Sequence, residues 1–154
     1  MYLIDGNNVM GQRVGWHRDK AAAQRRLLND LARLAWAAKR RITVVFDGAP
    51  NESFREGSAF RGVKILYARP GSDADTRIVE MVERERNRKN LTVVTSDNSL
   101  AARVRACGVR VMRAGELRRK LDELAAINET TNRTEPKLDE ISDWLHYFGI
   151  DENE

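Results

Sequence analysis

The sequence contains very few of the residues that form covalent cross-links or zinc cages. It has one cysteine, Cys107, and two histidines in 154 residues. A single cysteine excludes an intramolecular disulfide framework and a zinc site built from several cysteines. His17 and His146 lie far apart in the sequence, so we interpret both as surface or packing residues. Cys107 precedes Gly108 on an apolar face, which favours a small packing residue over a nucleophile.

Long apolar segments and the common phosphate-binding loops are also missing. No apolar run approaches the length of a membrane span, and the N-terminal residues lack the basic-then-apolar pattern of a secretory signal. We therefore expect a cytoplasmic protein with no membrane partner. Neither G-x-x-x-x-G-K-[ST] nor G-x-G-x-x-G occurs. A phosphatase with an aspartyl nucleophile would favour a second acid two residues after Asp5, where this sequence has Asn7.

Charge is distributed unevenly along the chain. The 154 residues, 42% hydrophobic and 32% charged, suit one globular domain with a real core. Residues 1–125 contain 25 basic and 15 acidic residues, a net charge of +10, whereas residues 126–154 contain 2 and 8, a net charge of −6. A basic body with an acidic tail suggests a polyanionic partner, most simply nucleic acid.

Aspartates recur at the ends of apolar runs. Asp5, Asp47 and Asp97 each follow a short run that is typical of a buried strand. Gly6 and the asparagines after it predict a tight turn directly after Asp5. Asp75 opens a predicted helix. Because the carboxyl ends of parallel strands meet at one edge of a sheet, we expect these four acids to converge there.

The pattern of apolar residues predicts strands that alternate with helices. We expect strands at residues 2–5, 42–46, 63–67, 91–95 and 109–112, helices at 19–41, 73–88, 99–107 and 115–126, and loops at 9–18 and 52–62. This order predicts an α/β fold, a three-layer α/β/α sandwich with a mainly parallel central sheet. We divide the chain into a main domain at 1–127, a linker at 128–137, and an acidic C-terminal helix and tail at 138–154.

Clustered carboxylates of this kind suit a hard divalent metal ion. Carboxylates held close together repel one another unless a cation lies among them. Mg²⁺ or Mn²⁺ takes oxygen ligands and can join carboxylates to a substrate phosphate. Such a site can activate a water for attack on a phosphodiester. An acidic metal site on a basic body therefore points to a metal-dependent nuclease.

Four motifs occur in an order that resembles a known family. They are Ile4-Asp5-Gly6-Asn7-Asn8, Val45-Phe46-Asp47-Gly48, Gly71-Ser72-Asp73-Ala74-Asp75-Thr76-Arg77-Ile78 and Val94-Thr95-Ser96-Asp97-Asn98. Together they resemble the NYN domains of the PIN-like nuclease superfamily, most closely the bacterial YacP-like branch, over about residues 1–125. The resemblance implies a PIN-like fold, a Mg²⁺ or Mn²⁺ ion and endoribonuclease activity.

The resemblance also assigns site residues. It implies that Asp5, Asp75 and Asp97 form the catalytic metal site and that Asp47 is the acid after the second strand. Asp73, a further candidate metal ligand, stands where the family often has a small polar residue. Some members of the YacP-like branch act on messenger RNA at the ribosome, which implies the ribosome as a partner.

Residues near the acids are candidates for contact with single-stranded RNA. Candidate phosphate contacts, expected on loops at the carboxyl edge of the sheet, are Arg13, Arg18, Arg55, Arg61, Lys64 and Arg69, and other candidate substrate contacts are Asn8, Ser96 and Asn98. Ser96 could instead cap the helix that follows it. Trp16, Phe54 and Phe60 could stack on unpaired bases or pack the loops against the core.

The sequence leaves two hypotheses about the function of the whole chain. One is a metal-dependent endoribonuclease, and the other is an RNA- or ribosome-binding adaptor that keeps a nuclease fold without useful turnover. The C-terminal helix at residues 138–148 carries an apolar stripe. It could dock on its own domain, bind a partner or compete with RNA for the basic face.

Overall fold

The fold is described for residues 1–131 of a computed structural model. The strands in this range are β1 (Tyr2–Asp5), β2 (Ile42–Phe46), β3 (Ala59–Phe60), β4 (Val63–Tyr67), β5 (Thr92–Val94) and β6 (Arg110–Met112). The α-helices are α1 (Gly6–Met10), α2 (Lys20–Ala38), α3 (Ala74–Arg84), α4 (Asn98–Ala106) and α5 (Ala114–Thr131). Short 3-10 helices lie at Trp16–Arg18 and Arg88–Asn90.

The six strands form one sheet in the order β3-β4-β2-β1-β5-β6. All neighbours are parallel except β3, which pairs antiparallel with β4, so the predicted mainly parallel sheet is confirmed. The edge strand β3 lies in the segment expected to be a loop. Arg61 and Gly62, with φ values of 47° and 89°, form the two-residue turn that joins β3 to β4.

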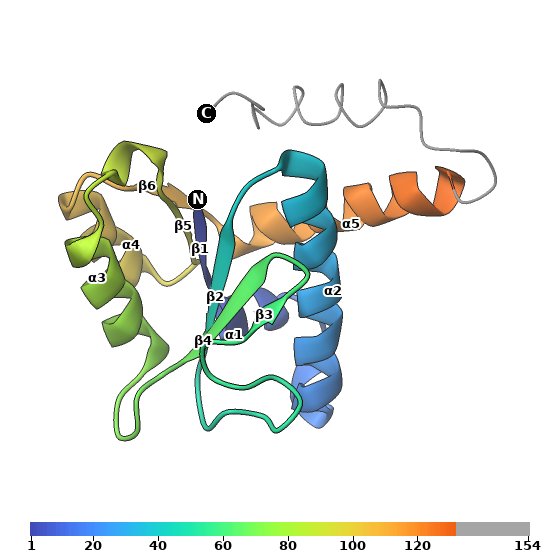
Figure 1. Cartoon of the computed structure of the whole chain (residues 1–154), viewed down its shortest axis with the longest axis horizontal. Coiled ribbons are helices and arrows are strands. Elements are labelled where there is room, and N and C mark those ends of the chain that lie inside the picture. The colour runs from blue at the N-terminus through green and yellow to red at the C-terminus, as the bar shows by residue number, and fades with distance from the viewer. Residues whose placement is uncertain (132–154) are drawn as a thin grey trace.

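Each face of the sheet has its own apolar core. Ile4 and Val44 are fully buried on the face that carries α1, α2 and α5. Leu3 comes directly before Ile4 in β1, and Val45 comes directly after Val44 in β2. Both are fully buried against α3 and α4. Alternate strand residues point to opposite faces, so both faces of a central strand must be apolar. Figure 1 shows the two groups of helices on either side of the sheet, which confirms the predicted three layers.

Side-chain caps start the helices close to the expected positions. Asp19 caps α2 by accepting a hydrogen bond from a backbone N–H of the first turn. Asp73 does the same for α3. The expected end of α3 near Arg88 is too late, because the backbone becomes extended at Glu85 and the helix ends at Arg84.

The turn predicted after Asp5 is wrong, because α1 begins at Gly6. Gly6 does not adopt a positive φ. A Cβ atom at Gly6 would lie 2.5 Å from Cδ1 of Phe46, so glycine lets α1 pack directly against β2. The expected loop over residues 9–18 is shorter than predicted, since α1 continues to Met10 and the Trp16–Arg18 turn is helical.

The last described helix runs past its expected end. α5 continues to Thr131, into the segment expected to be a linker. The rest of that linker and the predicted helix at 138–148 lie outside the described residues, so the division of the chain into domain, linker and tail stays a prediction. None of the helices within residues 1–131 has the length and apolarity that a bilayer crossing requires.

Candidate active site

Asp5 stands at the centre of the candidate site. It is the last residue of β1, the strand between β2 and β5, and only 4% of it is exposed. The pKa of Asp5 is raised from 3.8 to about 7. The main cause is burial, which disfavours the charged carboxylate, and the negative charges of Asp75 and Asp47 add to it. A hydrogen bond from Thr95 acts in the opposite direction.

Asp75 connects Asp5 to the other acids. It lies in the first turn of α3, partly buried, and its pKa is raised by burial and then by the charges of Asp97, Asp73 and Asp47. Asp75, at the start of α3, therefore lies close enough to repel the carboxylates at or after the ends of β1, β2 and β5. The structure brings together the four acids that the sequence singles out.

Two of these acids also anchor helices. Oδ1 of Asp47 accepts a hydrogen bond of 2.8 Å from the backbone N–H of Ala74, and the N–H of Asp47 donates to Oδ1 of Asn7 over 3.0 Å. Oδ1 of Asp97 accepts from the N–H of Leu100 over 3.0 Å and caps α4. Asp47 thus holds the start of α3, and with it Asp75, against the end of β2.

Asp73 has a different environment from the other acids. Its side chain is fully exposed, and its carboxylate accepts a hydrogen bond of 2.8 Å from the N–H of Thr76. The pKa of Asp73 is lowered, first by a hydrogen bond from the side chain of Thr76 and then by this bond from its backbone N–H. The geometry accounts for Asp73 as the cap of α3.

The polar candidate residues beside the acids form hydrogen bonds that join separate segments of the chain. Oδ1 of Asn8 accepts a hydrogen bond of 2.7 Å from the N–H of Ser96. Oγ of Ser96 accepts one of 3.0 Å from the N–H of Ala114, so Ser96 caps α5 and not the helix that follows it directly. Oδ1 of Asn98 accepts one of 2.8 Å from Arg113. These bonds fasten α1, the segment after β5 and the start of α5 to one another beside the acids.

Two residues of the site were missed in the sequence. Thr95 is fully buried, and its Oγ1 donates to Asp5 over 3.3 Å while it accepts from the N–H of Asp97 over 3.1 Å. Asn7 holds the backbone of Asp47. The available signal was a hydroxyl at the end of an apolar strand and an amide next to an acid, and neither pattern is specific without the fold.

Two candidate RNA contacts lie on the expected side of the molecule. Arg55 is exposed on the loop after β2, next to Glu56, whose carboxylate accepts from the N–H of Tyr67 at the carboxyl end of β4. Arg13 lies on the loop after α1 and forms an ion pair of 3.0 Å with Asp122 of α5.

The placement of Arg61 on a carboxyl-edge loop is wrong. Its turn leads into Val63, the first residue of β4, which pairs with Ile42, the first residue of β2. Arg61 therefore lies at the amino edge, away from the acids.

The rings of Phe54 and Phe60 contact each other edge to face at 5.7 Å and pack against the core, which favours the packing alternative for both.

Comparison with known proteins decides the family. The profile of the YacP-like NYN domain matches residues 2–146. The chain belongs to the YacP-like NYN domain family. Its fold is that of a PIN-like ribonuclease, as the sequence motifs suggested. A comparison with curated proteins gives no match.

Two crystal structures of Rae1 (YacP) from Bacillus subtilis have the same fold. One matches with a TM-score of 0.72 and 23% identity over 86% of this chain and 79% of that chain. The other, of the W164L mutant, matches with a TM-score of 0.70 and 22% identity over 90% of this chain and 87% of that chain. At this level of identity the similarity establishes the fold alone.

The donor set of this NYN domain fits a hard divalent ion that shares its ligands with substrate. Within residues 1–131, no three Asp, Glu, His or Cys side chains are close enough to form a metal cage. Mg²⁺ needs no such cage, because it commonly uses one or two carboxylates together with waters and substrate phosphates. Asp5 and Asp75 offer oxygen ligands only, and their repulsion would be relieved by a cation.

Proposed function

We propose that this YacP-like NYN domain is a metal-dependent endoribonuclease that hydrolyses phosphodiester bonds of single-stranded RNA. The observation that supports it most strongly is the convergence of four acids from separate segments, Asp5, Asp47, Asp75 and Asp97. The repulsion among them costs folding free energy, so a cluster of this kind is more easily explained by function than by stability.

Each acid has a distinct role in the proposal. Asp5 and Asp75 would hold the Mg²⁺ or Mn²⁺ ion together with waters and a substrate phosphate, and Asp97, which caps α4 through one carboxylate oxygen, would add its negative charge beside them. Asp47 positions Asp75 by holding the start of α3. We assign Asp73 to the cap of α3 and not to the metal. When bound, the ion would supply an activated water and stabilise charge on the phosphodiester.

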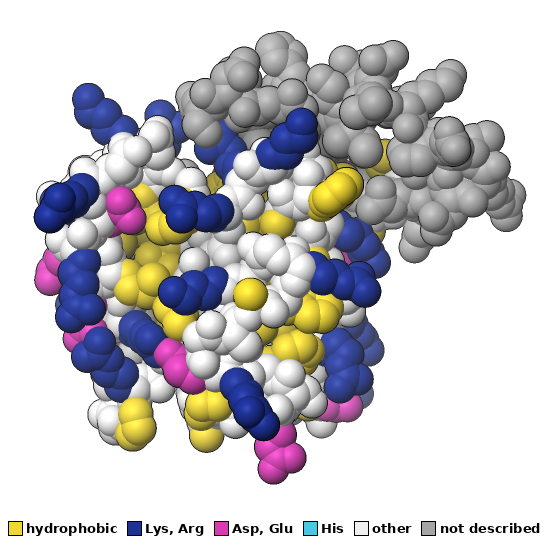
Figure 2. All heavy atoms as spheres, viewed as in Figure 1, with side chains coloured by type: hydrophobic (Ala, Val, Ile, Leu, Met, Phe, Trp, Pro, Cys, Tyr) yellow, Lys and Arg dark blue, Asp and Glu magenta, His cyan; other side chains and the backbone are white. Residues whose placement is uncertain are grey.

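The surface charge supports RNA as the substrate. Residues 1–125 carry a net charge of +10, and Figure 2 shows Lys and Arg side chains spread over the face in view, with fewer Asp and Glu. A basic surface attracts polyanions and concentrates them near the acids. Arg55, exposed on a loop at the carboxyl edge, is a proposed phosphate contact.

The family resemblance supports a more specific setting, messenger RNA on the ribosome. This setting is tested by comparing the cleavage rate of one RNA when it is free and when it is bound to ribosomes. Faster cleavage of the ribosome-bound RNA supports the setting, and equal rates contradict it.

One observation favours the alternative, an adaptor that binds RNA without cleaving it. The acids of residues 1–131 form no ready-made cage for a metal ion. An adaptor with this fold would bind RNA equally well with and without divalent metal and would leave it intact.

A cleavage assay separates the two functions. Labelled single-stranded RNA is incubated with protein freed of metal by a chelator, and Mg²⁺ or Mn²⁺ is then added back. The enzyme proposal predicts internal cuts that depend on the ion and disappear in Asp97→Asn, whose side-chain oxygen can still cap α4. Intact RNA under every metal condition, with binding retained, would establish the adaptor. Equal cleavage by wild type and Asp97→Asn would remove Asp97 from the site.

A further inference from the structure

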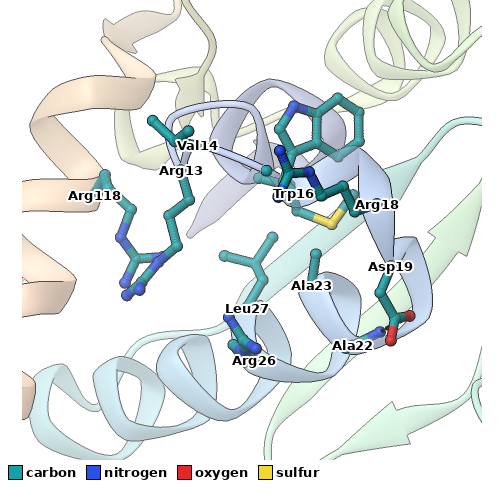
Figure 3. Close-up of a pocket in the computed structure, with 12 residues that line it drawn as sticks. Arg13, Val14, Trp16, Arg18, Asp19, Ala22, Ala23, Arg26, Leu27 and Arg118 are labelled. Carbon is teal, nitrogen blue, oxygen red and sulfur yellow. Dashed lines mark hydrogen bonds between the residues drawn. The ribbon is translucent and has the colours of Figure 1, made fainter.

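A pocket lined by arginines lies between α1, α2 and α5, near the candidate active site. Its volume is about 360 Å³, and its wall comes from the end of α1, the loop after it, the start of α2 and the first turns of α5. The lining residues that matter here are Arg13, Trp16, Arg18, Arg26, Leu27 and Arg118. Figure 3 shows the side chains of the four arginines around the pocket, with Leu27 between them.

The topology places this pocket at the same edge of the sheet as the acids. α1 starts directly after Asp5, and five residues at 1.5 Å each make it only about 7 Å long. α2 leads back to the amino end of β2, so its first turns lie at the carboxyl edge. α5 starts beside Ser96, which caps it at Ala114, and Gly115 lies close to Gln12 of the loop after α1. The pocket and the acids therefore lie at the same edge of the sheet, where one RNA strand can contact both.

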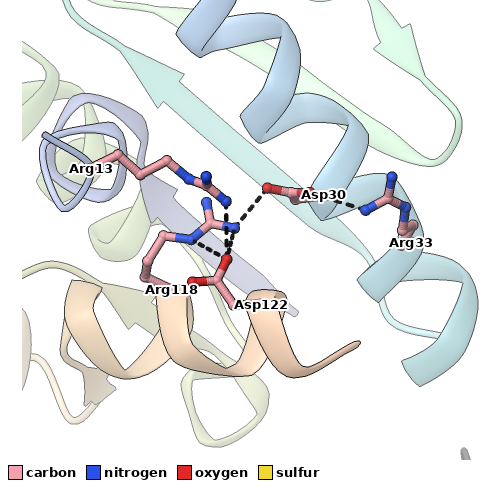
Figure 4. Close-up of polar contacts among 5 residues, drawn as sticks. All are labelled: Arg13, Asp30, Arg33, Arg118 and Asp122. Carbon is pink, nitrogen blue, oxygen red and sulfur yellow. Dashed lines mark hydrogen bonds and ion pairs between the residues drawn. The ribbon is translucent and has the colours of Figure 1, made fainter. Parts of the chain in front are cut away.

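Two of the arginines are fixed by ion pairs. Arg118, whose side chain is 9% exposed, donates to Asp30 over 2.7 Å and to Asp122 over 2.8 Å. Arg13 pairs with the same Asp122 over 3.0 Å. Figure 4 shows Arg118 between the two carboxylates, so that α2, α5 and the loop after α1 are held together. These pairs build the wall of the pocket and neutralise part of its charge.

The other two arginines keep their charge for a ligand. Arg18 and Arg26 are exposed, and neither forms an ion pair within the described part of the chain. The one acid in the lining, Asp19, already accepts a hydrogen bond as the cap of α2. The pocket thus presents two unpaired guanidinium groups, which suits a phosphate.

The lining of the pocket also contains an aromatic ring. Trp16 is partly buried, packs against the core and lines the pocket. Met10 and Leu27 supply apolar lining. Nζ of Lys20 lies over the ring, 5.8 Å from its centroid, so a base that stacks on Trp16 takes the place of this lysine. Such stacking contributes about 1–3 kcal/mol per base. The pocket volume is also within the range of small-molecule sites.

We propose that this pocket binds one nucleotide of a single-stranded RNA, outside the cleavage site. Trp16 stacks on the base, and Arg18 and Arg26 contact the phosphate. The choice of RNA as ligand rests on the proposed function, whereas the preference for an anion with an attached ring follows from the pocket itself. Occupancy of this pocket would set the register of the strand relative to the acids.

Binding measured without cleavage tests the phosphate contacts. The double variant Arg18→Ala, Arg26→Ala is compared with Arg25→Ala, Arg84→Ala, which removes the same charge from exposed helix positions outside the pocket. An oligoribonucleotide is titrated into each protein in chelator at fixed salt. We expect the pocket variant to lose about tenfold or more in affinity, which equals about 1.4 kcal/mol, and the control to lose about twofold. Equal losses in the two variants would overturn the proposal.

Tryptophan fluorescence tests the stacking. Addition of the oligoribonucleotide should quench the emission of wild type and of Trp36→Phe, whose ring is 85% exposed outside the pocket. Trp16→Phe should lose most of this quenching. Quenching that survives in Trp16→Phe and disappears in Trp36→Phe would contradict the pocket.

These outcomes are independent of catalysis. RNA held by Arg18, Arg26 and Trp16 but never cleaved would leave the pocket in place and contradict the proposed function. Metal-dependent cleavage with equal binding by the pocket and control variants would do the reverse. Preference for an acidic peptide over the oligoribonucleotide would overturn the assignment of the ligand.

Discussion

Thr95 donates a hydrogen bond from Oγ1 to Oδ2 of Asp5 over 3.3 Å, between residues 90 positions apart. The same oxygen accepts from the N–H of Asp97 over 3.1 Å. One buried hydroxyl therefore links the central acid of the site to the acid at the end of β5. The bond favours the charged form of Asp5, against the burial that disfavours it.

Thr95→Val should damage both the stability and the titration of the site. Valine has a similar shape but cannot bond to Asp5 or to the N–H of Asp97, so we expect a loss of about 1–2 kcal/mol in the free energy of unfolding. The pKa of Asp5 should rise further, and the acid limb of the pH–cleavage profile should move to higher pH. Thr92→Val, at the start of β5, is the control. Equal effects of the two substitutions would contradict the role of Thr95.

The stability of the metal-free protein should fall as the pH rises from about 4 to about 7. In this range the folded protein holds the Asp5 proton, whose pKa is raised from 3.8 to about 7, more tightly than the unfolded chain does. Asp5→Asn removes this titration and should be the more stable protein at pH 8, by about 2–4 kcal/mol. Denaturant unfolding of both proteins in chelator across this range measures the difference. Parallel pH profiles would show that the pKa of Asp5 is not raised.

Gly6→Ala should destabilise the fold through contact with a ring. The added Cβ would lie 2.5 Å and 2.6 Å from two atoms of Phe46, so α1 or the ring must shift, at a cost of about 1–3 kcal/mol. Phe46→Leu opens space at this contact. The double variant should therefore lose less stability than the sum of the single variants, and strict additivity in denaturant unfolding would contradict the clash.

Arg118→Met should cost much more stability than removal of an exposed arginine from the same network. It leaves the carboxylate of Asp30, 11% exposed, without its buried partner, for which we expect a loss of about 2–4 kcal/mol. Arg33→Ala removes a 45% exposed partner of the same Asp30 and should cost about 0.5 kcal/mol or less. Similar melting temperatures for the two variants would show that Arg118 contributes no more than a surface pair.

The sequence predicted the parts of the fold that depend on local pattern. The strand at residues 42–46 could be predicted because its residues are mostly apolar and β-branched. The starts of α2 and α3 could be predicted because Asp19 and Asp73 stand directly before the helical patterns, where N-caps are required. The convergence of Asp5 and Asp75 followed from the rule that parallel strands end at one edge.

The missed features depend on contacts between distant segments or are too short to show a period. α1 has five residues, fewer than two turns, and its glycine is required by Phe46, forty positions away. β3 has two residues, so the edge on which Arg61 lies could not be predicted without the hairpin. The ion pair of Arg118 with Asp30 joins residues 88 positions apart and leaves no pattern in the sequence.

The central claim is that the converging acids cleave RNA, and Asp75→Asn tests it most directly. Asp75 caps no helix, since Asp73 has that role in α3, so the substitution should leave the melting temperature of the metal-free protein unchanged or raised. Glu83→Gln, exposed near the other end of the same helix, is the matched control. The measurement is the single-turnover rate of cleavage of single-stranded RNA with Mg²⁺ or Mn²⁺. We predict a loss of at least about a hundredfold for Asp75→Asn and a wild-type rate for Glu83→Gln, on the scale of removing one charge-stabilising group from an active site. A wild-type rate for Asp75→Asn would contradict the claim.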